Sequence, residues 1–76
     1  MKILYDPEVD AMYIEFCELQ PGAAEMRELS EDINVNYGPG GKPAGIEILN
    51  ASVIFGQELH KVVVEVSPAR RVAKTG

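Results

Sequence analysis

Short runs in which apolar and polar residues alternate recur along this chain, and they constrain its fold more than any other feature. The pattern is clearest at 11–17, where Met12, Ile14 and Phe16 share one side of an extended chain. It returns at 33–37 with the same spacing. Because successive side chains of a strand point to opposite faces, each run predicts a β-strand with one apolar face.

Turn residues separate these runs and divide the chain into short strands. Pro7 fixes φ at the second position of a turn, and Asp6 can accept a hydrogen bond from the backbone that follows. The glycine-rich stretch 38–42 is the strongest turn signal, and it predicts a hairpin between the strands on either side. Further strands are expected at 2–5, 24–29 and 43–49, of which 24–29 has the weakest pattern.

The alternation stops after residue 49, and the next segment has two interpretations. Asn50 and Ser52 are candidate N-cap residues. They favour a short helix whose apolar side consists of Val53, Ile54, Phe55 and Leu59, although Gly56 weakens it by about 1 kcal/mol. The alternative is a further strand through 53–55, since β-branched residues favour strands.

Residues 61–66 form an unusual segment because they are apolar on both sides of an extended chain. The valines stand at 62, 63, 64 and 66. A strand with this pattern is covered on both faces. In a chain of 76 residues, one face must meet the helix or another copy of the chain.

Together these runs predict one small α+β domain over 1–68. We expect a meander of four to six short antiparallel strands in one sheet, with one short helix packed on one face. A chain of this size has a thin core, so we also expect a homo-oligomer, most simply a dimer. The last eight residues, 69–76, carry three basic side chains and are expected to be a flexible tail.

Three separated segments resemble a known family of small proteins. These are Tyr5-Asp6-Pro7 with Asp10-Ala11-Met12-Tyr13-Ile14 just after it, then Asn34-Val35-Asn36-Tyr37, and finally Gly45-Ile46-Glu47-Ile48-Leu49-Asn50-Ala51-Ser52. In this order they are similar to bacterial proteins grouped as domain of unknown function 2283, over roughly residues 2–52. The resemblance implies a compact antiparallel sheet followed by a short helix, in a prokaryotic cytoplasm. It implies no activity and no catalytic residues.

Charge and cysteine content limit the partners that this chain can have. Through residue 68 there are four basic residues against twelve acidic ones, a balance of −8. An acidic body repels phosphate, so we expect no nucleic acid on the folded part. The sequence has no apolar run long enough to span a membrane and no signal peptide, and we expect no membrane partner. The single cysteine, Cys17, fits a reducing cytoplasm.

Candidate metal and phosphate motifs are incomplete. Asp6, Glu8 and Asp10 alternate as at the start of a calcium loop, but that loop requires glycine and glutamate where Ala11 and Cys17 stand. The turn at 38–42 lacks the glycine spacing and the hydroxyl residue of a phosphate loop. A zinc site requires four nitrogen or sulfur ligands, and one chain offers two. We therefore expect no cofactor and no metal.

No complete catalytic constellation is present in the sequence, which predicts no catalytic, cofactor-binding or metal-binding residue. Cys17 and His60 are the only thiol and imidazole; the commoner role of such a cysteine is a small buried hydrophobe. The first hypothesis is a non-enzymatic interaction or regulatory module, with a possible unidentified protein partner. The alternative is a small ligand-binding or hydrolytic protein whose site forms between subunits. Its candidate residues are Asp6, Asp10, Tyr13 and His60.

Overall fold

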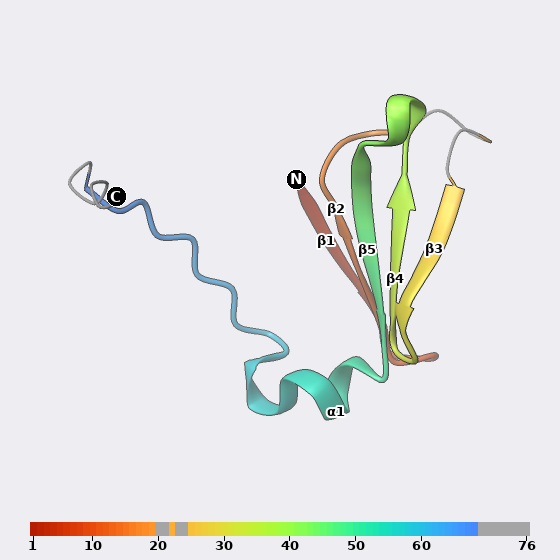
Figure 1. The fold of residues 1–76 in the computed structure, drawn as a ribbon. Coiled ribbons are helices and arrows are strands. Elements are labelled where there is room, and N and C mark those ends of the chain that lie inside the picture. The colour runs from red at the N-terminus through yellow and green to blue at the C-terminus, as the bar shows by residue number, and fades with distance from the viewer. Residues whose placement is uncertain (20–21, 23–24, 69–76) are drawn as a thin grey trace.

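A computed structural model describes residues 1–19, 22 and 25–68, and it contains one antiparallel sheet of five strands (Figure 1). The strands are β1 (Lys2–Asp6), β2 (Ala11–Glu15), β3 (Glu25–Ser30), β4 (Ile33–Tyr37) and β5 (Pro43–Leu49). A short 3-10 helix, η1 (Pro39–Gly41), lies between β4 and β5. The sheet is followed by the helix α1 (Ala51–Phe55) and a 3-10 turn, η2 (Gly56–Glu58). The predicted α+β fold is confirmed.

The strand order is β1-β2-β5-β4-β3. Consecutive antiparallel pairs join β3 to β4 and β4 to β5, and β5 also pairs with β2. This arrangement makes β5 the central strand and leaves β1 and β3 at the two edges. Local sequence signals do not predict this strand order, because the chain crosses from β2 to the opposite edge of the sheet before it returns to β5.

The strand registers bring the apolar side chains onto one face. Met12 of β2 lies opposite Ile48 of β5, and Ile14 lies opposite Ile46. Ile48 also lies opposite Ile33 of β4. We call this side of the sheet the apolar face. The other side, the polar face, carries Tyr13, Glu15, Asn34, Asn36 and Glu47 at the alternate positions.

The helix packs on the apolar face through a few residues. Ala51 is fully buried and joins Met12 and Ile48 in the core cluster, against which Phe55 and Leu59 also pack. The helix predicted after Asn50 is confirmed, and the strand alternative for 53–55 is wrong. Its predicted apolar side is only half correct, since Val53 is 79% exposed and Ile54 is 45% exposed.

Two predicted turns are confirmed in detail. The backbone N–H of Glu8 donates to Asp6 Oδ1 at 3.0 Å, which is the local bond expected of Asp6. In the hairpin between β4 and β5, the Gly38 N–H donates to the Lys42 carbonyl at 2.8 Å. Gly40 and Gly41 both have a φ near +80°, a conformation that favours glycine.

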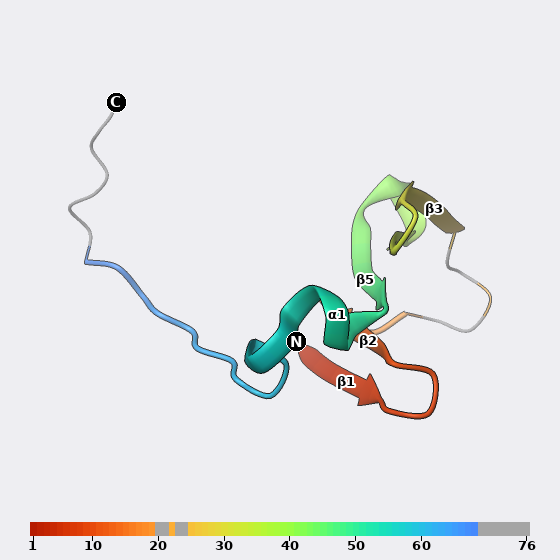
Figure 2. The same ribbon diagram turned by 90° about the horizontal axis from the view of Figure 1, so that it is seen from below.

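The strand predicted at 61–66 is wrong for the single chain. These residues are extended, but they lie in no sheet. We call residues 61–66 the valine arm. Figures 1 and 2 show it leaving the body after η2 and running away from the sheet. Its valines stay largely outside the core, since Val62 is 60% exposed and Val66 is 91% exposed. The predicted tail, 69–76, lies outside the described residues.

Candidate functional site

Asp10 connects the turn after β1 to the start of α1. Its Oδ1 accepts hydrogen bonds from the Tyr5 hydroxyl at 2.7 Å and from the Ser52 backbone N–H at 2.9 Å. Its Oδ2 accepts from the Ser52 hydroxyl at 2.7 Å, and its carbonyl accepts from the Ala51 N–H at 2.9 Å. Asn50, at the N-cap position, makes no side-chain cap bond. Asp10 therefore caps this helix from a distant part of the chain.

These bonds change the acidity of two groups in opposite directions. The hydrogen bonds from Ser52, and then that from Tyr5, lower the pKa of Asp10 below its usual value. The same bond to Asp10 raises the pKa of Tyr5. Asp10 is thus ionised at neutral pH, and both of its oxygens are occupied by donors of the same chain. Such a carboxylate stabilises the turn, and because it carries no proton it cannot act as a general acid.

Cys17 and His60 do not form a catalytic pair. The ring of His60 meets that of Tyr5 edge to face, with the centroids 6.0 Å apart. Tyr5 lies opposite Met12, whereas Cys17 lies beyond the end of β2, and the strand from Met12 to Glu15 alone spans roughly 10 Å at ~3.4 Å per strand residue. Cys17 is exposed, so its predicted role as a buried hydrophobe is wrong. The strand predicted to include it ends at Glu15, and Cys17 follows two residues later, where its N–H donates to the Ala44 carbonyl of β5 at 3.4 Å.

Polar side chains pair across three strands on the polar face. Asn36 Nδ2 donates to the Tyr13 hydroxyl at 3.1 Å, and Asn34 Nδ2 donates to Glu47 Oε1 at 3.1 Å. The Tyr13 ring crosses Gly45 so closely that a Cβ there would collide with the Tyr13 hydroxyl. The sequence does not predict this pairing, because the pairing depends on the strand order.

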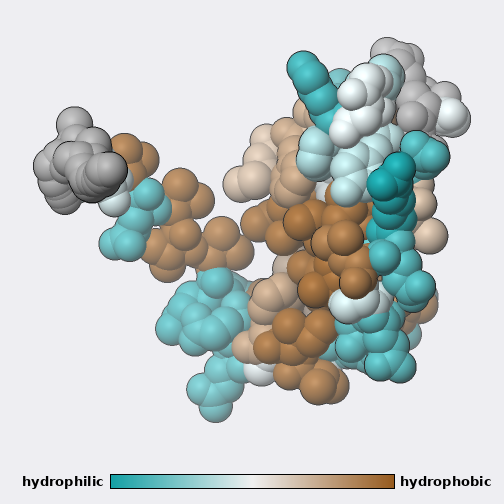
Figure 3. Space-filling model, viewed as in Figure 1, coloured by the Kyte–Doolittle hydropathy of each residue, from teal (hydrophilic) through white to brown (hydrophobic). Residues whose placement is uncertain are grey.

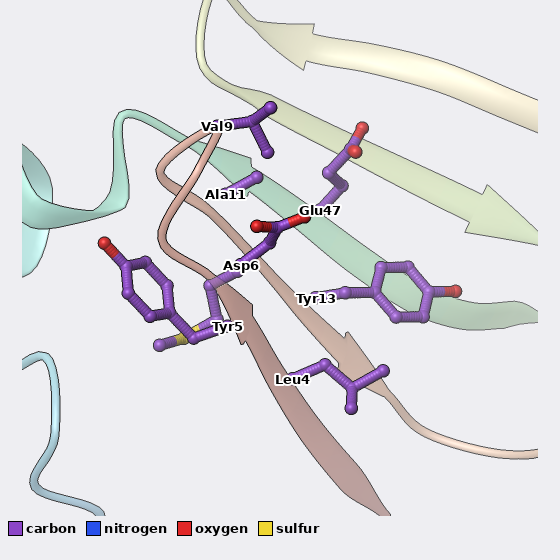
Figure 4. Close-up of a pocket in the computed structure, with 8 residues that line it drawn as sticks. Leu4, Tyr5, Asp6, Val9, Ala11, Tyr13 and Glu47 are labelled. Carbon is purple, nitrogen blue, oxygen red and sulfur yellow. The ribbon is translucent and has the colours of Figure 1, made fainter.

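A depression of about 340 Å³ lies beside this network, at the end of β1 (Figure 4). Asp6, Val9, Tyr13 and Glu47 line it, and Figure 4 shows Tyr5 and Tyr13 pointing in opposite directions from neighbouring strands. Of the four residues of the ligand-site hypothesis, the structure brings Asp6 and Tyr13 together here. Asp10 is engaged with Ser52, and His60 lies against Tyr5.

A second depression, of about 290 Å³, lies on the apolar face between the sheet, the helix and the arm. Ile3, Met12 and Ile14 line it from the sheet; Phe55, Leu59, Val62 and Val63 line it from the C-terminal side. Figure 3 shows apolar residues gathered over the sheet and along the arm. A continuous group of apolar side chains on an exposed surface is typical of a protein-interaction site.

Within the described parts of the chain, the structure holds no group of three or more His, Cys, Asp or Glu side chains placed to bind a metal ion. The alternating Asp6, Glu8 and Asp10 form a turn that bonds to its own chain. Among the same residues, no helix is long and apolar enough to cross a membrane.

Comparison with known proteins adds a family but no activity. No curated protein matches the chain, and no solved structure matches it. One family model matches residues 2–52, which cover all five strands and the start of α1. The resemblance noted from the three sequence segments is therefore confirmed. The matching residues make up more than half of the chain, and this protein belongs to the family described as protein of unknown function (DUF2283).

Proposed function

We propose that this chain is a non-enzymatic protein-interaction module that acts as a homo-oligomer, most simply a dimer, with the apolar face of its sheet as the contact surface. The observation that carries the proposal is the depression on that face. Three sheet side chains, Ile3, Met12 and Ile14, meet the apolar residues of the helix and the arm there. The arm valines beside them remain more than half exposed.

The size of the core supports self-association. Among the described residues, only Ala44 and Ala51 are almost completely buried, and no large side chain is. A domain of this length buries only ~60% of the surface of its unfolded chain. Contact between apolar faces would remove further apolar surface from water, at ~25 cal/mol per Å².

The acidic charge of the body and the exposed cysteine bear on the class of partner and on the cellular compartment. The acidic body, with a balance of −8 through residue 68, disfavours nucleic acid as a partner. Cys17 is free and exposed, which suits a reducing compartment. Together with the family resemblance, these features support a bacterial cytoplasm as part of the proposal.

Light scattering coupled to size-exclusion chromatography, from 1 to 100 µM, tests self-association. We expect twice the chain mass of 8.3 kDa at the upper end of this range. Ile3→Gln, on the apolar face, should shift the protein toward monomer, whereas Val53→Gln, on the exposed side of α1, should not. Circular dichroism must show that both variants remain folded. A monomer at every concentration would exclude the homo-oligomer.

A second candidate function is the binding of a small polar ligand on the polar face, with the site completed by another subunit. The depression beside Asp6, Tyr13 and Glu47 favours it, because two carboxylates and a phenol line it. Amide chemical shifts measured during a screen of small polar compounds would test it. Binding should move the signals of Tyr13 and Gly45, and a screen without such shifts would leave only the interaction function.

A further inference from the structure

We propose that the valine arm of one copy adds to the free edge of β1 in a second copy, as an antiparallel sixth strand with Val63 opposite Leu4. This inference rests on the proposed function, because it requires two copies to associate. It goes further by naming the segment, the edge, the direction and the register of the contact.

Two edges of the sheet are open, and they differ in sequence. β3 is an edge of exposed residues that includes Glu25, Arg27 and Glu28. Charged side chains of this kind protect an edge against a further strand. β1 carries the apolar run Ile3-Leu4-Tyr5 between its two charged ends. Among the described strands it is paired only with β2, so its outward peptide groups are available to another strand.

The alternation of the arm fits the two faces of this edge. Ile3 and Tyr5 lie on the apolar face, because they pair with Ile14 and Met12, while Leu4 pairs with Tyr13 on the polar face. In the proposed register, three arm residues extend the apolar face and three extend the polar face. Val62, Val64 and Val66 join the apolar face, and Lys61, Val63 and Glu65 join the polar face.

Charge then selects the direction and the register. In the antiparallel register, Lys61 lies opposite Asp6 and Glu65 lies opposite Lys2. The parallel arrangement with the same faces places Lys61 opposite Lys2, and Glu65 opposite Asp6, so that like charges meet at both ends. A slip by one residue places both arm charges on the apolar face. Opposite charges on directly facing residues stabilise a strand pair, and like charges destabilise it.

The course of the arm favours a second copy over its own β1. Exposure of its valines increases from 60% at Val62 to 91% at Val66, because the arm diverges from the body that it leaves (Figures 1 and 2). Its only ion pair among the described residues joins Lys61 Nζ to Glu58 Oε2 at 3.7 Å, and both side chains are about two thirds exposed. Such a pair is weak and easily given up. A two-fold axis would let two copies exchange arms in identical contacts.

Disulfide trapping tests the register. In a Cys17→Ser background, Leu4→Cys and Val63→Cys are combined in one chain; both positions are exposed, so the folded monomer should tolerate them. Mild oxidation should give a covalent dimer on a non-reducing gel, with a tryptic disulfide peptide that joins positions 4 and 63. The matched control combines Leu4→Cys with Val64→Cys, whose side chain points to the opposite face. It should cross-link at most a tenth as well.

The outcomes separate this inference from the proposed function. A link between positions 4 and 63 within one chain would overturn the exchange, since the arm would then close on its own β1. Equal trapping of the control would overturn the register. A dimer by light scattering that gives no link between positions 4 and 63 would overturn arm exchange and leave the interaction module standing. A monomer by light scattering would remove both proposals.

A charge swap within the arm tests the direction without changing composition. In the double variant Lys61→Glu with Glu65→Lys, residue 61 would place a negative charge opposite Asp6, and residue 65 would place a positive charge opposite Lys2. We expect the dimer dissociation constant to increase about tenfold at low salt, with a smaller change at high salt, because exposed ion pairs are weak and are screened. An unchanged dissociation constant would overturn the proposed direction.

Discussion

The central strand β5 and the valine arm are both rich in aliphatic residues, but they differ in structure. β5 lies between β2 and β4, and its Ile48 is 7% exposed, whereas Val66 of the arm is 91% exposed and the arm pairs with no strand. The difference shows that β-propensity describes how well a residue fits a sheet, and that a strand also requires a neighbouring edge.

The same difference has a thermodynamic consequence. The contacts of β5 form within one chain, so their contribution to the free energy of unfolding is independent of protein concentration. Contacts that the arm makes with another copy contribute only as the concentration rises above the dissociation constant. The body and the arm should therefore respond differently to mutation and to dilution.

The largest expected effect comes from shortening an aliphatic side chain in each region. Ile48→Ala removes buried atoms at the centre of the sheet and should lower the free energy of unfolding by about 2–5 kcal/mol. Val64→Ala should change it by less than about 0.5 kcal/mol in dilute solution, since Val64 is 76% exposed. Urea denaturation at 1 µM measures both. Equal losses would mean that the arm belongs to the core of its own chain.

Gly45→Ala should have the next largest effect, because β5 passes beneath the Tyr13 ring at this residue. The added Cβ would collide with the Tyr13 hydroxyl and lie 2.9 Å from the carbonyl oxygen of Ile14. We expect a loss of about 1–3 kcal/mol, as for other overpacked sites. Thermal denaturation measures it. Gly40→Ala is a poor control because φ is positive there, whereas Tyr13→Phe isolates the lost hydroxyl bond to Asn36 at about 1 kcal/mol.

The pH dependence of stability should reveal the bonds at Asp10. Because the pKa of Asp10 is lowered by folding, its contribution is present above the ordinary carboxyl value of about 3.9 and is lost as the pH falls through the folded value. Asp10→Asn should flatten this fall in stability toward acid, as measured by urea denaturation between pH 2.5 and 7. Folding raises the pKa of Tyr5, so the stabilisation from its hydroxyl bond is lost as the pH rises into the alkaline range. Tyr5→Phe should lack this alkaline loss of stability.

The sequence predicts the local features of the fold well and its long-range features poorly. Alternation located the five strands to within a few residues, and turn chemistry located the bond at Asp6 and the hairpin at 38–42. These signals depend on neighbours in the chain. The strand order, and hence the meeting of Asn36 with Tyr13, depends on pairing between distant segments, which alternation does not encode.

The helix and the arm show two further limits. Asn50 marks the start of α1, but the cap bonds come from Asp10, forty residues earlier in the chain, through a contact that no local pattern reveals. The valine arm has a strand pattern that its own chain does not use. In both cases the sequence indicates a local preference, for a helix start or for a strand. Contacts with distant residues or with another chain decide whether that preference is satisfied.

The smallest expected effect concerns the junction between the body and the arm. Glu58→Gln removes the exposed ion pair with Lys61 and should change the free energy of unfolding by less than about 0.5 kcal/mol in dilute solution. It leaves Lys61 free to face Asp6 of another copy, so dimerisation should be unchanged or slightly tighter. Urea denaturation and light scattering of the same samples measure both quantities. A clear loss of dimer would instead show that this pair fixes the direction in which the arm leaves the body.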